Sequence, residues 1–463
     1  MVLSEILIEE IIQRASDQHG YQQLERAARA TRFCSRPIRL ASVDSTQGAI
    51  PGSPGALGPS PHDYEEVYMK ACGTRRRTLC ESCSEIYQGD VRQLVRSGLL
   101  GGKGVPEEVS GHPAIFATLT APSFGPVHRS ITKGGRSLPC HVSESGSCPH
   151  GRSLGCLSVH QNTDEIVGSP ICPECYDYKG AVIWNAASTK LWQRTTIYMR
   201  RALARLVGIP VSELSTIVRI SYAKVIEYQR RGLIHVHLVI RGDDPEDRSL
   251  APSPDITPEL IGLALRMAIS QVIIKVDIDG ISRQVRWGNQ VDVRSIDGTS
   301  TGAVANYIAK YATKSANESG GLDHRFQDRY QIESSTVPRH LREMALTAWD
   351  LGQDPKYSEL NLGMWAHDLG HRGHFLTKSR RFSVTLSYLR QIRQSWSESQ
   401  RIEQGAEAEQ MFTCDDEFHF VGQGWMFSCD SYLVAQRHLE RCEGRMIAKE
   451  VIAEEALPQG ALI

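Results

Sequence analysis

The stretch Leu233-Ile-His-Val-His-Leu-Val-Ile240 decides the fold of the middle of the chain. Apolar residues alternate with His235 and His237, so on a β-strand the two imidazoles project from one face and the aliphatic side chains from the other. The turn residues Arg-Arg-Gly at 230–232 separate this strand from a second β-rich stretch at 216–228. This order predicts a β-hairpin with one apolar face.

The surrounding sequence supplies the partners of that hairpin. Residues 114–120, Ala-Ile-Phe-Ala-Thr-Leu-Thr, predict a further strand, and a second strand is expected near 285–293. Apolar residues recur at helical spacing near 189–207, 258–272 and 301–315. We therefore expect an α+β core with a mainly antiparallel sheet and flanking helices.

Shifts in composition predict four segments along the chain. Residues 1–62 are a helical segment followed by a linker rich in Gly, Pro and Ser, and residues 63–112 are a first Cys-rich segment. The core is expected at 113–345, with a Cys/His-rich insertion at 121–186. Residues 346–463 form a mixed C-terminal region with a basic patch and an acidic helical tail.

The charge is unevenly distributed over the 463 residues. The chain carries 52 Lys and Arg against 53 Asp and Glu. However, residues 190–241 hold ten bases and two acids, and residues 394–463 hold five bases and thirteen acids. The basic segment and the patch at 371–381 indicate contact with phosphates, although a basic run is also typical of a solvated surface. The candidate DNA contacts are Arg219, Lys224, Arg230, Arg231, Lys314, Arg372, Lys378, Arg380 and Arg381.

No apolar run reaches the ~18 residues that a membrane-spanning helix needs, and the first ten residues carry acids where a signal peptide carries bases. We expect a soluble cytoplasmic protein without a membrane partner.

His235 and His237 are candidate metal ligands. If the turn is centred on Arg231, Glu227 lies across the hairpin near His235 and offers a carboxylate as third ligand. Imidazole and carboxylate with open positions suit Mn²⁺ or Mg²⁺ acting as a Lewis acid on a phosphoryl oxygen. The alternatives are a polar strand face without metal and a salt bridge from Glu227 to Arg230 or Arg231.

Tyr307 and Tyr311 are four residues apart and share one face of the helix expected there. Either phenol is a candidate nucleophile, with Lys310 and Lys314 as nearby cations that steady a phosphate. Simple packing is the alternative, because Tyr64 has the same spacing to the next tyrosine in an unremarkable region.

Cysteine spacing predicts one or two structural zinc ions. Two Cys-x2-Cys pairs, at 80–83 and 172–175, have the spacing of zinc knuckles, and reduced thiols of a cytosolic chain hold Zn²⁺ more readily than disulfides. Cys140, His141 and His150 also lie in this region, and the sequence leaves open which residues complete each site. The chosen zinc ligands are Cys72, Cys80, Cys83, Cys148, Cys156, His160, Cys172 and Cys175. The remaining thiols, Cys34, Cys414, Cys429 and Cys442, are interpreted as plain buried side chains.

Three motifs together resemble the rolling-circle replication initiators of the HUH endonuclease superfamily. They are Phe116-Ala-Thr-Leu-Thr-Ala-Pro-Ser123, His235-Val-His237 and Tyr307-x3-Tyr311, in that order. A closer likeness, to the initiators of actinobacterial integrative and conjugative plasmids, covers nearly the whole chain. Its motifs are Cys80-x2-Cys83-Ser-Glu-x-Tyr87, Gly101-Gly-Lys-Gly-Val-Pro106, Ala121-Pro-Ser-Phe-Gly-Pro-Val-His128, Cys172-Pro-x-Cys-Tyr-Asp-Tyr178 and Arg372-Gly-His-Phe-Leu-Thr-Lys-Ser-Arg-Arg381.

The resemblance implies a ferredoxin-like or RRM-like core, an endonuclease that nicks one strand at a double-strand origin, and products with a 3′-OH and a 5′-phosphotyrosine. It implies Tyr311 as the primary nucleophile, whereas Tyr307 occupies a place that relatives fill with Tyr or Glu. Origin DNA, single-stranded or in a hairpin at the nick, and a host helicase and polymerase are the implied partners. Trp287 is a candidate for base stacking, with a core position as the alternative.

Two other functions remain open from the sequence. A relaxase or single-strand transposase uses the same kind of site for transfer rather than replication. A zinc-ribbon DNA-binding regulator binds DNA without cutting it, and in that case His235, His237 and the tyrosines are structural.

Overall fold

The structure is a computed structural model that describes residues 4–42, 67–142, 146–296, 302–304, 306–308, 324–403 and 418–455. The chain divides into two compact units. One comprises residues 1–87 and 395–463, and the other comprises residues 88–394. This division differs from the four segments expected from composition, because the two ends of the chain fall in the same unit.

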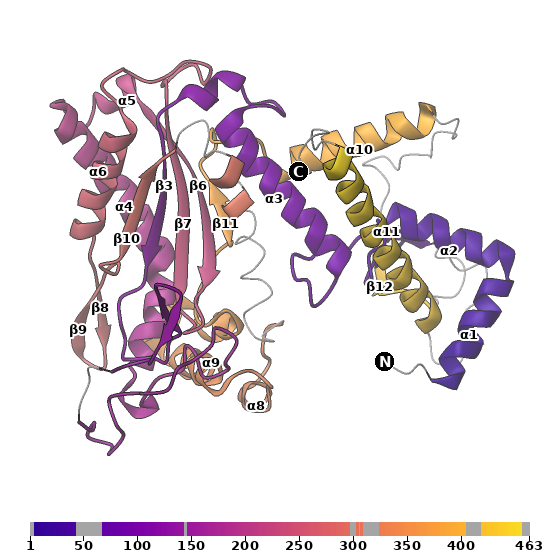
Figure 1. Cartoon of the computed structure of the whole chain (residues 1–463), viewed down its shortest axis with the longest axis horizontal. Helices are drawn as coiled ribbons and strands as arrows, with labels where there is room; N and C mark the ends of the chain where they lie inside the picture. Colours follow the sequence, from indigo (N-terminus) through magenta and orange to yellow (C-terminus); the bar gives the residue numbers. More distant parts are fainter. Residues whose placement is uncertain are drawn as a thin grey trace, which may run out of the picture. The chain divides into compact units, whose positions relative to one another are not determined.

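An antiparallel five-stranded sheet forms the centre of the larger unit, in the order β10-β3-β7-β6-β11 (Figure 1). Its strands are β3 (Ala114–Thr120), β6 (Arg219–Tyr228), β7 (Ile234–Asp243), β10 (Val291–Ser295) and β11 (Leu376–Lys378). The predicted hairpin is confirmed as β6 and β7, and its register pairs Glu227 with His235. The sheet and the helices around it confirm the mixed α+β class with antiparallel strands.

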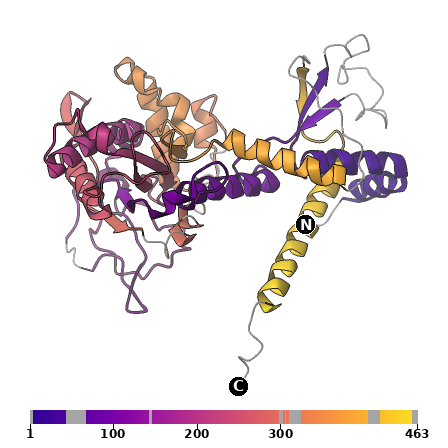
Figure 2. The ribbon, with the colours of Figure 1, turned by 90° about the horizontal axis from the view of Figure 1, so that it is seen from above.

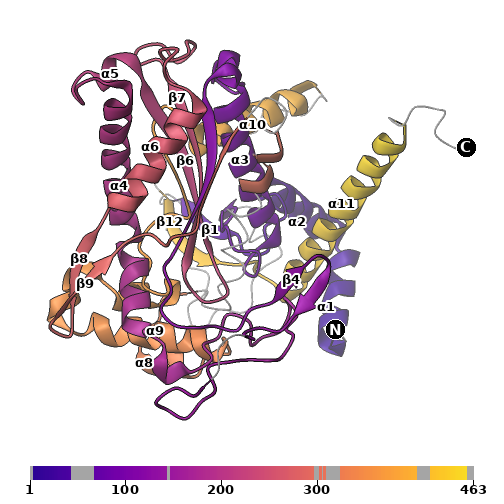
Figure 3. The same cartoon turned by 60° about the vertical axis from the view of Figure 1, so that its left-hand side comes forward.

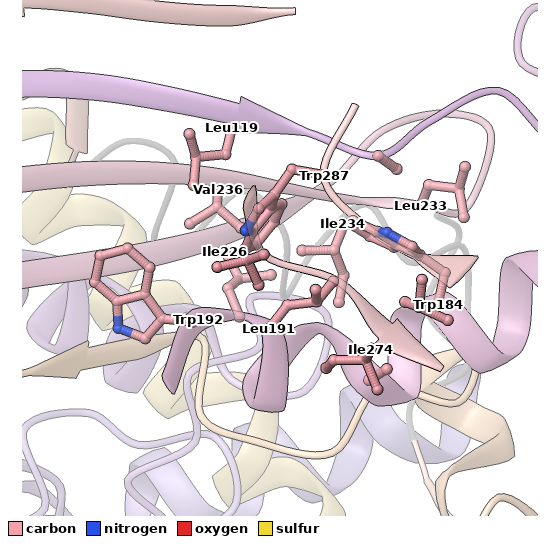
Figure 4. Packing of buried hydrophobic residues seen from close by; sticks show 14 of the residues in the cluster. Leu119, Trp184, Leu191, Trp192, Ile226, Leu233, Ile234, Val236, Ile274 and Trp287 are labelled. Atoms are coloured by element: carbon pink, nitrogen blue, oxygen red, sulfur yellow. The ribbon is translucent and has the colours of Figure 1, made fainter. Parts of the chain in front are cut away.

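One face of this sheet is apolar and packs against two helices, α4 (Tyr178–Val207) and α6 (Pro258–Gln271). Because alternate residues of a strand point the same way, β7 delivers Ile234, Val236, Leu238 and Ile240 to this face. Figure 4 shows residues of this core, among them Leu191 of α4, Ile226 and Val236 of the sheet, and Trp287.

Trp287 belongs to this core and does not present a stacking surface. Its side chain is 3% exposed, its ring packs edge-on against Trp184, and its indole N–H donates to Thr195 Oγ1 at 2.9 Å. The core reading of Trp287 is therefore correct and the base-stacking reading is wrong in this structure.

Asn185 of α4 fixes the turn between β6 and β7. This buried amide donates to the carbonyl oxygens of Gly232 and Leu369, at 2.9 and 3.0 Å, and its oxygen accepts from the Ile234 N–H at 3.2 Å. Gly232 has a φ of +70°, and a Cβ there would lie 2.5 Å from the sulfur of Met344. The turn is thus specified by one buried amide and one glycine.

The segment between β3 and α4 is made of loops with little regular structure, and Figure 3 shows it below the ends of the central strands. It contains only a small hairpin of β4 (Ile131–Lys133) and β5 (Arg136–Leu138) and one 3₁₀ turn, η3 (Pro173–Cys175). The insertion expected at 121–186 is shorter in the structure. Its loops end at Asp177, which is the N-cap of α4, and the helix begins at Tyr178.

The larger unit also holds a separate hairpin and several helices, most of them short. These elements are η2 (Glu107–Gly111), α5 (Leu214–Ile217), β8 (Ile274–Ile278), β9 (Ile281–Val285), α8 (Arg329–Glu333), α9 (Arg339–Gly352), η4 (Pro355–Leu360) and η5 (Gly363–Asp368). Two further helices, α3 (Glu81–Leu100) and α10 (Leu386–Glu403), run across the boundaries of the units. The single strand expected at 285–293 is in fact the end of β9 and the start of β10.

The smaller unit contains a three-stranded antiparallel sheet in the order β12-β1-β2. Its elements are α1 (Glu5–Ser16), α2 (Gln18–Ala30), β1 (Ile38–Ser42), β2 (Val67–Lys70), β12 (Phe418–Gln423) and α11 (Ser428–Glu455). Figure 2 shows the short strands of this unit beside the indigo helices α1 and α2. A core of seven buried residues, including Leu24, Met69 and Trp425, joins the helices to the sheet.

Among the described helices, none has both the length and the apolar character to cross a bilayer.

Candidate active site and nucleic-acid interface

The face of the sheet opposite α4 carries the predicted metal ligands. Register places Thr120 of β3 and Glu227 of β6 on either side of His235, and Thr118 beside His237. His237 is 1% exposed, with Nε2 3.2 Å from Glu227 Oε2 and Nδ1 3.3 Å from Thr118 Oγ1. The structure thus brings the two histidines and the glutamate together, as the hairpin predicted.

Tyr307 lies over this face. Residues 302–304 and 306–308 are helical, and the Tyr307 ring packs edge-on against His237 and Phe116, with centroids 5.3 and 5.6 Å away. Tyr307 is 40% exposed, so it lies beside the histidines and is still accessible to solvent. The three other members of the predicted tyrosine motif, Tyr311, Lys310 and Lys314, lie outside the described residues.

Burial holds His235 in the form that binds metal. Loss of solvent, followed by the neighbouring His237, lowers the pKa of His235 to about 4, and Glu227 opposes this shift. The imidazole is therefore neutral at pH 7, which leaves a ring nitrogen with a lone pair. Its Nδ1 lies 3.3 Å from Nε2 of Gln229, which fixes one side of the ring.

The donor set fits a hard divalent cation. Neighbouring ligands of an octahedral Mg²⁺ or Mn²⁺ are about 3 Å apart, given metal–ligand bonds of about 2.1 Å, and the 3.2 Å between His237 Nε2 and Glu227 Oε2 matches this. The ligand atoms of His235, His237 and Glu227 do not all lie within 4.8 Å of one another. Because His237 and Glu227 are close to each other, His235 is the side chain that stands further away. Of the three side chains, His237 and Glu227 are thus already at the spacing of two neighbouring ligands, and His235 is not.

Further along the same face, charged side chains are buried for structural reasons. Arg241 and Asp243 are both 0% exposed and form a paired salt bridge with N–O distances of 2.6 and 3.1 Å. Ser221 donates to the same carboxylate at 2.6 Å, and His112 Nδ1 lies 3.0 Å from it. These bonds lower the pKa of Asp243 despite its burial. Arg241 was counted in the basic segment, but it is not available to DNA.

The predicted DNA contacts fall into two groups. Arg219, Arg380 and Arg381 line a cavity of about 340 Å³ together with Arg200, and its floor includes Trp192 and Tyr222. Tyr222 belongs to the apolar face, so this cavity opens on the α4 side of the sheet and not beside the histidines.

The other predicted contacts are exposed or internally bonded. Arg372 is exposed, whereas Lys224 is 4% exposed and burial lowers its pKa to about 8. The expectation that Lys224 meets phosphate is therefore wrong for this structure. Lys378 donates to the Ser383 carbonyl at 2.7 Å.

Arg230 and Arg231 occupy the β6–β7 turn and bond to the Cys/His-rich segment. Arg230 donates to the Asp164 carbonyl at 2.6 Å, and Arg231 donates to the carbonyls of Ala121 and Pro122 at 3.1 and 3.0 Å. Neither is paired with Glu227 by any described bond. These two side chains attach the turn to the segment that follows β3.

The predicted zinc ligands are distributed over three groups of four, each with ligand atoms within 4.8 Å of one another. The groups are Cys34, Cys72, Cys80 and Cys83; His128, Cys140, Cys156 and His160; and Cys148, His150, Cys172 and Cys175. Cys34 was interpreted as a plain buried thiol, and this is wrong, because its sulfur lies 3.8 Å from that of Cys80. The structure also adds His128, Cys140 and His150 to the chosen set.

A fourth group, Glu85, His438 and Cys442, has three members. Arg445 donates to both the carboxylate and the thiol at 3.1 Å, so a guanidinium already neutralises this group. Cys442 is therefore not a plain buried thiol, whereas Cys429 is buried outside the metal-ligand groups of the described chain. Cys414 lies outside the described residues.

Comparison with known proteins gives two matches. Residues 20–438 match the family model described as "RepSA: Replication initiator protein, pSAM2". A "Replication initiator protein" from Streptomyces ambofaciens is 41% identical over 342 residues, which cover 71% of this chain and 70% of that protein. No solved structure matches the chain.

Proposed function

Because the chain belongs to the RepSA family of replication initiator proteins, we propose that it starts plasmid replication by nicking one strand of its origin DNA through a tyrosine. The observation that carries this proposal is the placement of Tyr307 against His237 on the face that also presents Glu227 and His235. A phenol beside two imidazoles and a carboxylate is the arrangement that metal-assisted phosphodiester attack needs. On this proposal, the central sheet with its histidines and tyrosines is the core of an HUH endonuclease.

His237 and Glu227 would hold the divalent ion, Mn²⁺ or Mg²⁺, and His235 would complete the set. When bound, the ion polarises a non-bridging oxygen of the scissile phosphate and so stabilises the charge that develops there. Thr118 fixes the His237 ring through Nδ1, so Nε2, on the side of Glu227, would be the nitrogen that binds the ion.

The reaction exchanges one ester bond for another. The tyrosine oxygen attacks phosphorus in line with the leaving 3′ oxygen, the phenolic proton is lost, and the 3′ oxygen takes up a proton. A 5′-phosphotyrosine and a 3′-OH primer result, so the number of phosphate ester bonds is unchanged and a later 3′-OH can reseal the strand without ATP.

Tyr311, four residues after Tyr307 in the sequence, is the proposed primary nucleophile. The assignment rests on the Ala309-Lys310-Tyr311 motif, and the position of Tyr307 supports it by bringing this helix onto the histidine face. Lys310 and Lys314 then contact phosphate. Tyr307 is the second tyrosine, available when the regenerated origin is cut again.

Origin DNA enters as a single strand or hairpin, because a base-paired scissile strand cannot bend into the site. Exposed arginines such as Arg219 and Arg372 contact its backbone. A host helicase then separates the strands, and a host polymerase extends the 3′-OH. The chain acts in the cytoplasm, where its plasmid replicates.

The test compares wild type with Tyr311→Phe on supercoiled plasmid carrying the origin, in Mn²⁺ or Mg²⁺. Relaxed circles and covalent protein–DNA adducts are expected for wild type and absent from Tyr311→Phe. Tyr330→Phe is the matched control, since Tyr330 is 74% exposed on α8 and contributes nothing to the histidine face.

Adducts that survive in the double variant Tyr307→Phe/Tyr311→Phe would contradict the tyrosine mechanism. Tight origin binding without nicking in either metal would instead support the zinc-ribbon regulator. Nicking with strand transfer between two plasmids but no replication in cells would favour a relaxase or transposase.

A further inference from the structure

The segment between β3 and α4 has no buried apolar cluster of its own among its described residues, and only a few of its apolar side chains, such as Phe124 and Val127, pack against the core of the sheet. Among its described residues from 122 to 175, the buried side chains are those of Cys140, His141, Cys148, His160, Pro170 and Cys172. The β4–β5 hairpin is exposed or half-buried throughout. Loops of this length with so little apolar burial need another source of order.

The first group of ligands has the dimensions of a tetrahedral zinc site. His160 Nε2 lies 3.2 Å from His128 Nδ1 and 3.4 Å from Cys156 Sγ, and Cys140 Sγ lies 3.9 Å from His128 Nδ1. Ligands at the corners of a zinc tetrahedron, with bonds of about 2.0–2.3 Å, stand about 3.3–3.8 Å apart. The four atoms therefore surround a space of the right size for one ion.

Supporting contacts around this group are those of a metal site. The Arg129 N–H donates to Cys140 Sγ at 3.2 Å, which stabilises a thiolate. The other ring nitrogen of His160, Nδ1, lies 3.7 Å from Asp164 Oδ2, the kind of outer carboxylate that orients a zinc-bound imidazole. The Asp164 carbonyl then accepts from Arg230 in the β6–β7 turn.

The second group repeats these dimensions with different ligands. His150 Nδ1 lies 3.3 Å from Cys175 Sγ and 3.8 Å from Cys172 Sγ. Together with Cys148 this gives three sulfurs and one nitrogen. All eleven described cysteines are free thiols, so their sulfurs are available as metal ligands.

The order of the ligands along the chain is the informative feature. The first group takes residues 128, 140, 156 and 160, and the second takes 148, 150, 172 and 175. Along the chain the ligands therefore come in pairs that alternate between the two groups: 128 and 140 belong to the first, 148 and 150 to the second, 156 and 160 to the first, and 172 and 175 to the second. Such interleaving ties four successive loops together, whereas two consecutive sites would fold two separate loops.

A third group stands in the smaller unit. The sulfurs of Cys34 and Cys80 are 3.8 Å apart, and backbone N–H groups of Cys72 and Ser35 donate to them at 3.3 and 3.4 Å. With Cys83 this group consists of four thiols, which suits Zn²⁺ and excludes the hard cations of the histidine face.

We propose that the chain holds three structural zinc ions, one in the Cys34–Cys83 group and two in an interleaved module spanning His128 to Cys175 that braces the β6–β7 turn. The zinc ions are separate from the divalent ion of the proposed nicking site, since their ligands are different residues.

Metal analysis of the full chain tests the number of ions. After dialysis against a chelator that removes weakly held metal, wild type is expected to retain three zinc ions per chain. X-ray absorption on the same sample should give an average of three sulfurs and one nitrogen per zinc, which needs no variant. A content of one zinc or none, or an average shell dominated by nitrogen and oxygen, would overturn the proposal.

Two double variants test the interleaving. Cys140→Ser/Cys156→Ser damages one site if the ligands interleave, so it should lose one zinc. Cys140→Ser/Cys148→Ser damages both sites of the module and should lose two. Consecutive sites predict the opposite result for the two variants, and that result would overturn the interleaved assignment. Cys429→Ser is the matched control and should retain all three ions.

Discussion

The central sheet and the Cys/His-rich segment are neighbours in one unit, but they are ordered by different physical means. In the sheet, Val236 and Leu238 are at most 1% exposed because alternation places every second side chain of β7 in the core. In the segment from 122 to 175, the buried positions are mostly Cys and His. Each buried apolar side chain adds its own contribution to stability, whereas a group of four metal ligands holds an ion firmly only when all four are in place.

This difference determines how each region should fail. Loss of one methylene in the sheet leaves a cavity in a fold that persists, whereas loss of one metal ion removes every connection that it made. The β6–β7 turn lies where the two regions meet, held from one side by Asn185 and from the other by Arg230 and Arg231.

The largest expected effect comes from removing the proposed zinc ions. A structural zinc ion is worth about 10–16 kcal/mol in small zinc-binding peptides, so a strong chelator should unfold residues 128–175 locally. Hydrogen exchange measured by mass spectrometry should show loss of protection there and in the turn at 229–233, while β3 and β7 stay protected. An equal loss of protection in residues 128–175 and in the sheet, or no loss in either, would contradict the claim that the two regions are ordered by different means.

A smaller effect is expected from Asp243→Ala, within the sheet. The change leaves Arg241 buried without its carboxylate and should cost about 3–5 kcal/mol in the free energy of unfolding. Urea unfolding of the zinc-loaded protein measures it. Asp292→Ala is the control, because the Asp292–Arg294 pair is solvent-exposed and should contribute about 1 kcal/mol or less. Similar losses for both variants would contradict the role assigned to burial.

Asn185→Leu should act on the junction of the two regions. It leaves the Ile234 N–H and the Gly232 carbonyl without their buried partner, and the expected cost is about 1–3 kcal/mol. Faster exchange of the Ile234 amide, with β3 unaffected, would locate the effect at the turn. An unchanged exchange rate would show that Asn185 is not needed to hold the turn.

A further effect, visible only as a change of stability with pH, concerns Lys224, a charged group on the apolar side of the sheet. Burial lowers its pKa from 10.5 to about 8, so between these values the folded state binds fewer protons than the unfolded state. Stability should therefore rise with pH across this window, by the linkage of proton binding to folding. Lys224→Met should remove that rise in urea unfolding curves at pH 7.5 and pH 10. A rise that persists in the variant would assign it to other groups.

Sequence reasoning succeeded where one local rule decides the structure. Alternation in 233–240 predicted which face carries His235 and His237, and the short turn fixed the register that pairs Glu227 with His235. It failed where the partner is distant. Nothing local distinguishes Cys34 from Cys429, because the three other thiols of its group lie 38 or more residues away.

The same limit explains the basic residues. Arg241 and Lys224 belong to a basic run, but their strand positions bury them, since period two and not charge decides which side chains of a strand reach solvent. The spacing of Tyr307 and Tyr311 predicted a shared helix face, and the contact of Tyr307 with His237 required the tertiary structure.

The most direct test of the proposed nicking mechanism is to locate the covalent bond to DNA. Trypsin separates the two tyrosines, because Tyr307 falls in the peptide 295–310 and Tyr311 in the peptide 311–314. After reaction with a single-stranded origin oligonucleotide in Mn²⁺, nuclease trimming and mass spectrometry should find the nucleotide on Tyr311-Ala-Thr-Lys314. A nucleotide on neither peptide, from a protein that cuts its origin, would contradict the account.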